Sequence, residues 1–102
     1  MKPEQKTTLF LCKRLERLRL KIDRLFPLMR GSVVSIGMVN KRPNYSLNMN
    51  GKTKMISLGH GKEIVARKWI DNYRKLLEVI DEMTLINIEI IRRMDYNSKK
   101  SE

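Results

Sequence analysis

The sequence predicts an α+β fold: two long helices in an antiparallel coiled-coil-like hairpin, with a three-stranded antiparallel β-sheet between them. Apolar residues recur at helical spacing towards both ends of the chain and alternate with polar residues in its middle. The middle part also contains Asn50-Gly51, a pair that favours a tight hairpin turn. A chain of 102 residues is expected to form a single domain, 1–102.

The first helix is predicted over residues 7–26. Either Thr7 or Thr8 can cap its start, since a threonine side chain accepts a hydrogen bond from the first turn. Proline disfavours helical geometry in the residue before it, so Pro27, followed by Gly31, ends the helix. Its apolar residues step at 4, 3, 4 and 3, which is the spacing of a heptad seam: Leu11, Leu15, Leu18, Ile22 and Leu25.

One flank of this helix is predicted to be basic. Its residues step at 3, 4 and 3: Arg14, Arg17, Lys21 and Arg24. A solvated helix face usually mixes charges of both signs, and here only Glu16 and Asp23 interrupt the basic residues. The pattern favours a binding surface over an ordinary solvated face.

The sheet is predicted over residues 32–58. A two-residue turn at Asn50-Gly51 places Leu47 opposite Lys54 and Tyr45 opposite Ile56. The other face of the hairpin then carries polar side chains that can hydrogen-bond to the edges of nucleic-acid bases: Asn44, Ser46, Asn48 and Thr53. A half-exposed sheet with no binding role fits this polar face equally well.

The second helix is predicted over residues 62–94, followed by a polar tail at 95–102. Its expected seam is Trp69, Tyr73, Leu76, Ile80, Met83, Asn87, Ile90 and Met94. Because this helix is longer than the first, its C-terminal half is expected to bury against a second copy or another protein through Ile86, Asn87, Ile90, Ile91 and Met94. Asn87 either fixes the register of that assembly or faces water.

The charge distribution points to a polyanionic partner. The chain has 22 Lys and Arg against 11 Asp and Glu, and residues 31–60 contain four basic and no acidic residues. Residues 61–102 are nearly neutral, with nine basic and eight acidic residues. A one-sided positive field is best explained by nucleic acid, whose phosphates would meet Arg14, Arg17, Lys21, Arg24, Lys41, Arg42, Lys52 and Lys54.

Enzymatic chemistry is not expected. One histidine and one cysteine cannot form a zinc site or a Cys/His nucleophilic pair, so neither a metal nor a cofactor is predicted. His60 lies between two glycines and is interpreted as a turn residue. The single Cys12 and the lack of a secretory segment favour a cytoplasmic protein, nucleoid-associated if it binds DNA.

Two resemblances follow from these residues. The runs 45–47, 50–54 and 56–59, followed by a helix, resemble the arm-type DNA-binding domain of tyrosine recombinases, in which a three-stranded sheet enters the major groove. Taken whole, with Trp69–Arg74 and Ile86-Asn87, the chain resembles small uncharacterised proteins encoded beside transposases of bacterial and archaeal mobile elements. Many of those proteins have a cysteine-rich run where this chain has residues 39–42, so a metal role is not implied here.

The sequence therefore predicts a non-enzymatic DNA-binding accessory or regulatory protein of a mobile element. RNA binding is the first alternative, with Tyr45 as the sheet's single candidate for base stacking. The second alternative is a protein-interaction module whose long helix docks a transposase or a similar partner. A homodimer or a helical protein partner is expected, and no membrane association.

Overall fold

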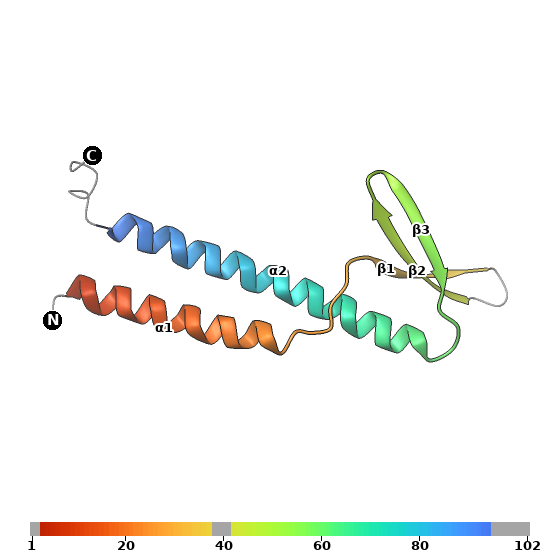
Figure 1. The fold of residues 1–102 in the computed structure, drawn as a ribbon, viewed down its shortest axis with the longest axis horizontal. Helices are drawn as coiled ribbons and strands as arrows, with labels where there is room; N and C mark the ends of the chain where they lie inside the picture. Colours follow the sequence, from red (N-terminus) through yellow and green to blue (C-terminus); the bar gives the residue numbers. More distant parts are fainter. Residues whose placement is uncertain (1–2, 38–41, 95–102) are drawn as a thin grey trace. The chain divides into compact units, whose positions relative to one another are not determined.

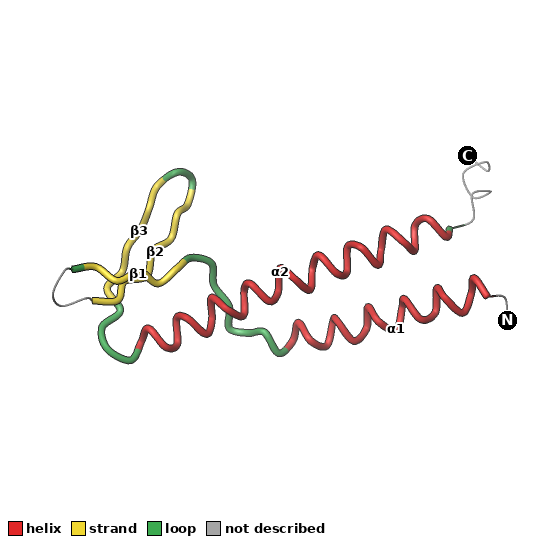
Figure 2. Tube along the Cα trace, turned by 180° about the vertical axis from the view of Figure 1, so that it is seen from behind, coloured by secondary structure: helices red, strands yellow, loops and turns green. Residues whose placement is uncertain are grey.

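The chain has an α+β fold with two helices and one three-stranded antiparallel sheet (Figure 1). The computed structural model describes residues 3–37 and 42–94. Along the chain the elements are α1 (Pro3–Asp23), β1 (Ser32–Ile36), β2 (Arg42–Met49), β3 (Lys52–Ser57) and α2 (Lys62–Arg93). The predicted fold class is confirmed at this level, while the predicted polar tail at 95–102 lies outside the described residues (Figure 2).

Helix α1 begins earlier than predicted. It starts at Pro3, so Thr7 and Thr8 lie inside the helix and the predicted threonine cap is wrong. Proline suits the first helical position because its fixed φ is helical and its missing amide hydrogen has no intrahelical acceptor there. The helix ends at Asp23, three residues before the predicted end at Phe26.

The predicted apolar seam of α1 is confirmed. Leu18 is buried, and Leu11, Leu15 and Ile22 are partly buried, whereas the residues between them are exposed. Leu25 continues the pattern past the helix end and is buried as well. Heptad spacing therefore identified the packed side of this helix correctly.

The β2–β3 hairpin has the predicted register and turn. Tyr45 pairs with Ile56 and Leu47 with Lys54. Asn50 and Gly51 form the turn, with φ values of 53° and 78°. Positive φ at both positions is what a type I′ turn requires, and its twist matches that of the two strands.

Strand β1 covers only part of this hairpin. It pairs with residues 42–46 of β2. The hairpin beyond Ser46 is therefore a two-stranded ribbon that extends past β1 (Figures 1 and 2). We call residues 47–54 the ribbon.

The segment between α1 and β1 is hydrogen-bonded to both α2 and the sheet. The side-chain amide of Asn72 donates to the Pro27 carbonyl at 2.9 Å, and the Met29 amide donates to the Trp69 carbonyl at 3.2 Å. The Tyr45 hydroxyl donates to the Arg30 carbonyl. Two carbonyls and one amide of this segment are thus bonded to partners distant in sequence, which holds this irregular segment in place.

The chain forms two compact units, and α2 contributes to both. One unit comprises α1 and the part of α2 from Leu77 onwards; the other comprises residues 25–76. In the second unit α2 buries Ala66 and Ile70, whereas in the first it buries Val79 and Ile86. At roughly 100° per residue these two pairs lie on nearly opposite sides of the helix.

The single seam predicted for α2 is therefore wrong in its second half. Ile80, Asn87 and Met94 are exposed there, and Val79 and Ile86 take the buried positions. The helix carries apolar residues on two faces, so a heptad fitted to the whole helix averages two different packed sides.

A substitution at Gly31 can test how closely the segment before β1 packs against Tyr45. It has a φ of 119°, and a Cβ there would lie 2.6 Å from Cε1 of Tyr45 and 2.7 Å from the Ser46 carbonyl oxygen. We expect Gly31→Ala to lower the free energy of unfolding, measured with urea, by about 2 to 4 kcal/mol, from backbone strain plus overpacking.

The matched control is Gly59→Ala. Gly59 also has positive φ, 66°, but no atom lies within 4 Å of the Cβ position. It should therefore show only the backbone cost, about 1 to 2 kcal/mol. Equal destabilisation of the two variants would contradict the close approach of Gly31 to Tyr45.

Candidate nucleic-acid interface

The predicted phosphate-contacting residues fall into two groups in separate units. Arg14, Arg17, Lys21 and Arg24 lie on or directly after α1, while Arg42, Lys52 and Lys54 lie on the sheet. Lys41 lies outside the described residues. The two groups are therefore described as two candidate surfaces.

The α1 group forms one flank of its helix. At roughly 100° per residue, Arg14, Arg17 and Lys21 fall within a quarter of the helix circumference. Arg24 follows directly after the helix end, and all four are exposed. Lys13 is exposed and adjoins them. It was missed because the prediction followed a strict 3, 4, 3 spacing. We call these five residues the basic flank.

Within the basic flank, Arg14 differs from the others. Its guanidinium forms an ion pair with Glu82 of α2, and the two side chains are 48% and 36% exposed. Among the ion pairs of the described residues, none involves Arg17, Lys21 or Arg24. Lys13 is likewise absent from them, so four cations remain for an external anion, while Arg14 is shared with its own chain.

The ribbon is open to solvent on both faces. Residues 48 to 54 are all exposed, and so is the rest of β3. Asn48 pairs directly with Thr53, so their side chains lie side by side on one face. Lys52 and Lys54 lie on the other face, next to Met49 and Leu47.

The face with Asn48 and Thr53 also holds the other predicted base-reading residues. Asn44 and Ser46 are partly buried, and the Asn44 side-chain amide donates to the Arg42 carbonyl at 3.2 Å. Met55 of β3 lies on this face, as the register of the hairpin predicts, and the register of β1 adds Val34 beside Asn44, which the sequence did not predict. The face is thus less polar than predicted, and its freest polar groups are Asn48 and Thr53.

Tyr45 is not a stacking residue. It is only 9% exposed, and its hydroxyl is bonded to the Arg30 carbonyl. The prediction that it lies exposed on the sheet is wrong, because the segment before β1 covers it. Among the described residues of the sheet there is no exposed aromatic side chain.

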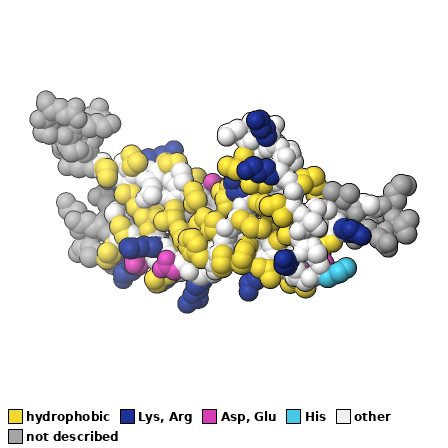
Figure 3. Space-filling view, turned by 45° about the vertical axis from the view of Figure 1, so that its right-hand side comes forward, with side chains coloured by type: hydrophobic (Ala, Val, Ile, Leu, Met, Phe, Trp, Pro, Cys, Tyr) yellow, Lys and Arg dark blue, Asp and Glu magenta, His cyan; other side chains and the backbone are white. Residues whose placement is uncertain are grey.

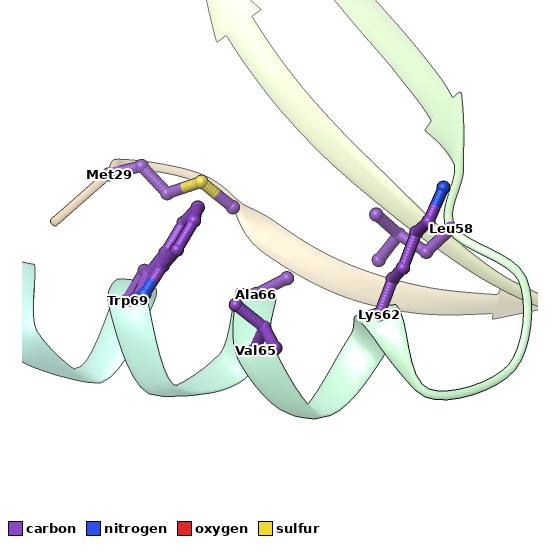
Figure 4. A pocket seen from close by; sticks show the side chains of 6 residues that line it. All are labelled: Met29, Leu58, Lys62, Val65, Ala66 and Trp69. Atoms are coloured by element: carbon purple, nitrogen blue, oxygen red, sulfur yellow. The ribbon is translucent and has the colours of Figure 1, made fainter. Parts of the chain in front are cut away.

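Two hollows adjoin the start of α2. One, of about 270 Å³, is lined by Met29, Leu58, Lys62, Val65, Ala66 and Trp69. In Figure 4 Trp69 reaches from the helix towards Met29, and Lys62 rises beside Leu58. Five of its six lining residues are apolar, so we interpret it as an incompletely filled part of the small core between the sheet and α2.

The second hollow is more polar. It also measures about 270 Å³ and is lined by Arg42, Pro43, Ser57, Gly59 and His60. His60 is exposed in the turn before α2, as the sequence predicted for a turn residue. The hollow offers a cation and a hydroxyl, groups that bind phosphate oxygens.

The predicted partner surface on α2 divides in two. Ile86 is 7% exposed and Ile90 is partly buried, so both belong to the packing of this unit; the prediction that a monomer exposes Ile86 is wrong. Asn87, Ile91 and Met94 are exposed. Asn87 therefore lies outside the packed side of α2, where it faces solvent in the single chain.

Other chemistry is not apparent in the described part of the chain. Residues 3–37 and 42–94 contain no cluster of His, Cys, Asp or Glu side chains arranged to hold a metal ion. Within the same ranges neither helix has a stretch long and apolar enough to cross a membrane.

On the face in Figure 3, hydrophobic side chains are widely exposed, with Lys and Arg side chains around them.

Comparisons with protein-family models, curated proteins and solved structures find no match to this chain.

The Arg14–Glu82 pair leads to a stability prediction. An ion pair between two side chains this exposed contributes little, because water screens it and the side chains lose rotamer entropy. In a double-mutant cycle with Arg14→Gln and Glu82→Gln, we expect a coupling free energy below about 1 kcal/mol in urea unfolding. A coupling above about 2 kcal/mol would instead make the pair a principal link within this unit.

Proposed function

We propose that this protein binds DNA without catalysing a reaction and that it acts as an accessory or regulatory factor of a mobile element. The observation that carries the DNA-binding proposal is the ribbon, a solvent-exposed two-stranded hairpin in a stretch, residues 31–60, that has no acidic residue. The mobile-element role rests only on the resemblance in sequence described above.

The ribbon suits the major groove of duplex DNA in size and chemistry. That groove is ~12 Å wide and admits a two-stranded β-ribbon. Asn48 and Thr53 on one face can hydrogen-bond base edges, while the ammonium groups of Lys52 and Lys54 can reach the phosphates that line the groove. Met55, exposed on the same face as Asn48 and Thr53, supplies apolar surface for thymine methyl groups.

The basic flank of α1 supplies affinity that does not depend on base sequence. Its exposed cations would release counterions from the DNA backbone on binding. For the unit that contains this flank we propose the antiparallel coiled-coil-like hairpin that the heptads predict. Its support is the Arg14–Glu82 ion pair together with the buried Leu18, Val79 and Ile86.

RNA binding is less well supported than DNA binding. RNA-binding sheets stack bases on exposed aromatic side chains, and Tyr45 is covered. A protein-interaction role for α2 is favoured by a different observation, the exposed apolar residues of its second half. A DNA-binding role would place the protein in the cytoplasm, associated with the nucleoid.

The basic flank can be tested through the salt dependence of binding. Replacing Arg17, Lys21 and Arg24 by Gln should weaken binding to a random duplex and reduce the log-log salt slope by roughly 2 to 3, since each neutralised phosphate contributes about 0.9. Fluorescence anisotropy at several salt concentrations measures this slope.

The control for that experiment removes the same charge elsewhere. Arg67, Lys75 and Arg92 lie on α2 near Glu63, Asp71 and Glu89, with nitrogen–oxygen distances of 4.0, 3.1 and 4.0 Å. Replacing these three by Gln should leave the slope nearly unchanged. An equal effect of both triple variants would show that only net charge matters and that the basic flank does not touch the DNA.

The ribbon can be tested through sequence discrimination. Asn48→Ala with Thr53→Ala should reduce the preference for a selected duplex over a random one by about 1 to 3 kcal/mol for each bidentate hydrogen-bonding interaction with a base that is removed, while binding to random duplex is retained. Asn44→Ala should have a smaller effect, because Asn44 is partly buried and bonded to its own strand. A wild-type protein without any sequence preference would contradict base reading by the ribbon.

A further inference from the structure

Helix α2 has a second apolar stripe that residues 3–37 and 42–94 leave uncovered. Leu77, Ile80 and Ile88 are 42%, 44% and 43% exposed, and Ile91 is 64% exposed. With Thr84 they step at 3, 4, 4 and 3 residues, which places them on one side of the helix. We call Leu77, Ile80, Thr84, Ile88 and Ile91 the outer stripe.

Thr84 does not interrupt the apolar character of this stripe. Its hydroxyl donates to the Ile80 carbonyl at 2.8 Å, within the helix. A threonine bonded back to the preceding turn has its polar group satisfied locally. It can therefore enter an apolar interface without a new hydrogen-bond partner.

The outer stripe continues a face that α2 buries elsewhere. Ala66 and Ile70, 3% and 4% exposed, and the partly buried Tyr73 precede Leu77 at the same helical spacing. Up to Tyr73 this face belongs to the core of the unit formed by residues 25–76. From Leu77 onwards the helix buries its other side, with Val79 and Ile86, and the stripe stays open.

We propose that the outer stripe docks against the same stripe of a second copy of this chain, in antiparallel orientation. The spacing 3, 4, 4, 3 reads the same in both directions about Thr84. A two-fold axis at Thr84 therefore pairs Leu77 with Ile91 and Ile80 with Ile88, apolar against apolar throughout. A self-complementary surface of this kind fits a second copy better than an unrelated partner.

The electrostatics agree with this occupant. The outer stripe contains no charged residue, so two copies bring no like charges together within it. Antiparallel helices also place the positive end of one macrodipole near the negative end of the other. The stripe spans 14 helical steps, ~21 Å, so the interface is small and dissociation in the micromolar range is expected.

This surface differs from the one that the sequence predicted. Ile86 and Ile90 are taken up by the chain's own packing, and only Ile91 is common to both sets. The dimer does not depend on the proposed DNA binding, because its test needs no nucleic acid. Its failure would leave the DNA-binding experiments unaffected.

Sedimentation equilibrium of the full chain tests the proposal, with Cys12→Ser introduced throughout to exclude disulfide-linked dimers. Wild type should dimerise with increasing concentration up to about 200 µM. Ile80→Glu and Ile88→Lys should each raise the dimer dissociation constant by at least about 100-fold, since each removes two buried isoleucines per dimer and inserts a charge.

The orientation is tested by mixing the two variants. In the antiparallel dimer residue 80 of one copy meets residue 88 of the other, so an equimolar mixture of Ile80→Glu and Ile88→Lys should recover association as a heterodimer. In a parallel dimer the two charges would not meet, and the mixture would stay dissociated, which would overturn the proposed orientation.

The matched control is Leu85→Lys. Leu85 is 68% exposed on the same helix but lies outside the outer stripe. This variant should dimerise as wild type does, and circular dichroism should show the same helix content in all variants. A wild type that stays monomeric at about 200 µM, or a Leu85→Lys variant that dissociates as Ile80→Glu does, would overturn the proposal.

Discussion

The hydrogen bonds and the close packing that hold residues 27–31 against α2 and the sheet are the constraint on which the unit containing the sheet depends. The stretch from Pro27 to Arg30 lies outside any helix or strand. Its Pro27 carbonyl, Met29 amide and Arg30 carbonyl are hydrogen-bonded to Asn72, Trp69 and Tyr45, respectively. Gly31 then allows the chain to pass directly against Tyr45. These contacts join β2 and the first half of α2 through a segment that belongs to neither, and the same contacts bury the tyrosine that would otherwise be available to a ligand.

Helix α2 shows how one regular element serves two different cores. Its first half buries Ala66 and Ile70, and its second half buries Val79 and Ile86 on nearly the opposite side. Such a helix needs apolar residues on two different faces. The face that is buried in the first half of α2 is exposed in its second half, and the face that is buried in the second half is exposed in the first. The outer stripe is the exposed half of one of these faces, which is why it has the spacing and composition of a core.

Charge and apolar surface are separated in a way that fits two kinds of partner. The cations of the basic flank lie on α1, and those of the ribbon lie in a stretch without acidic residues. On α2 exposed charges of opposite sign pair with neighbours along the helix, as in Asp71–Lys75 and Glu89–Arg93. Under the proposed function an anionic ligand would meet α1 and the ribbon, while the uncharged stripe of α2 would meet a protein surface.

The sequence by itself determined the features that depend on neighbours along the chain. The α+β class, the seam of α1, the register of the hairpin and the turn at Asn50-Gly51 all follow from local spacing and from the φ values that each residue tolerates. The start of α1 at Pro3 also had a local signal, which a search for a threonine cap overlooked. The basic residues of the candidate surfaces were equally readable, except for the omitted Lys13.

Only the tertiary structure decided which of several apolar or polar faces is covered. Heptad spacing predicted that Ile80 is buried, although the adjacent Val79 is also apolar. In the structure Val79 is buried and Ile80 is exposed, because of how the rest of the chain packs against the helix. Tyr45 has the sequence context of an exposed strand residue, but residues distant in the chain cover it and accept its hydrogen bond. Periodicity is a property of one element, whereas burial depends on what packs against it, so the sequence predicted the elements and the structure decided which of their faces remain open to a partner.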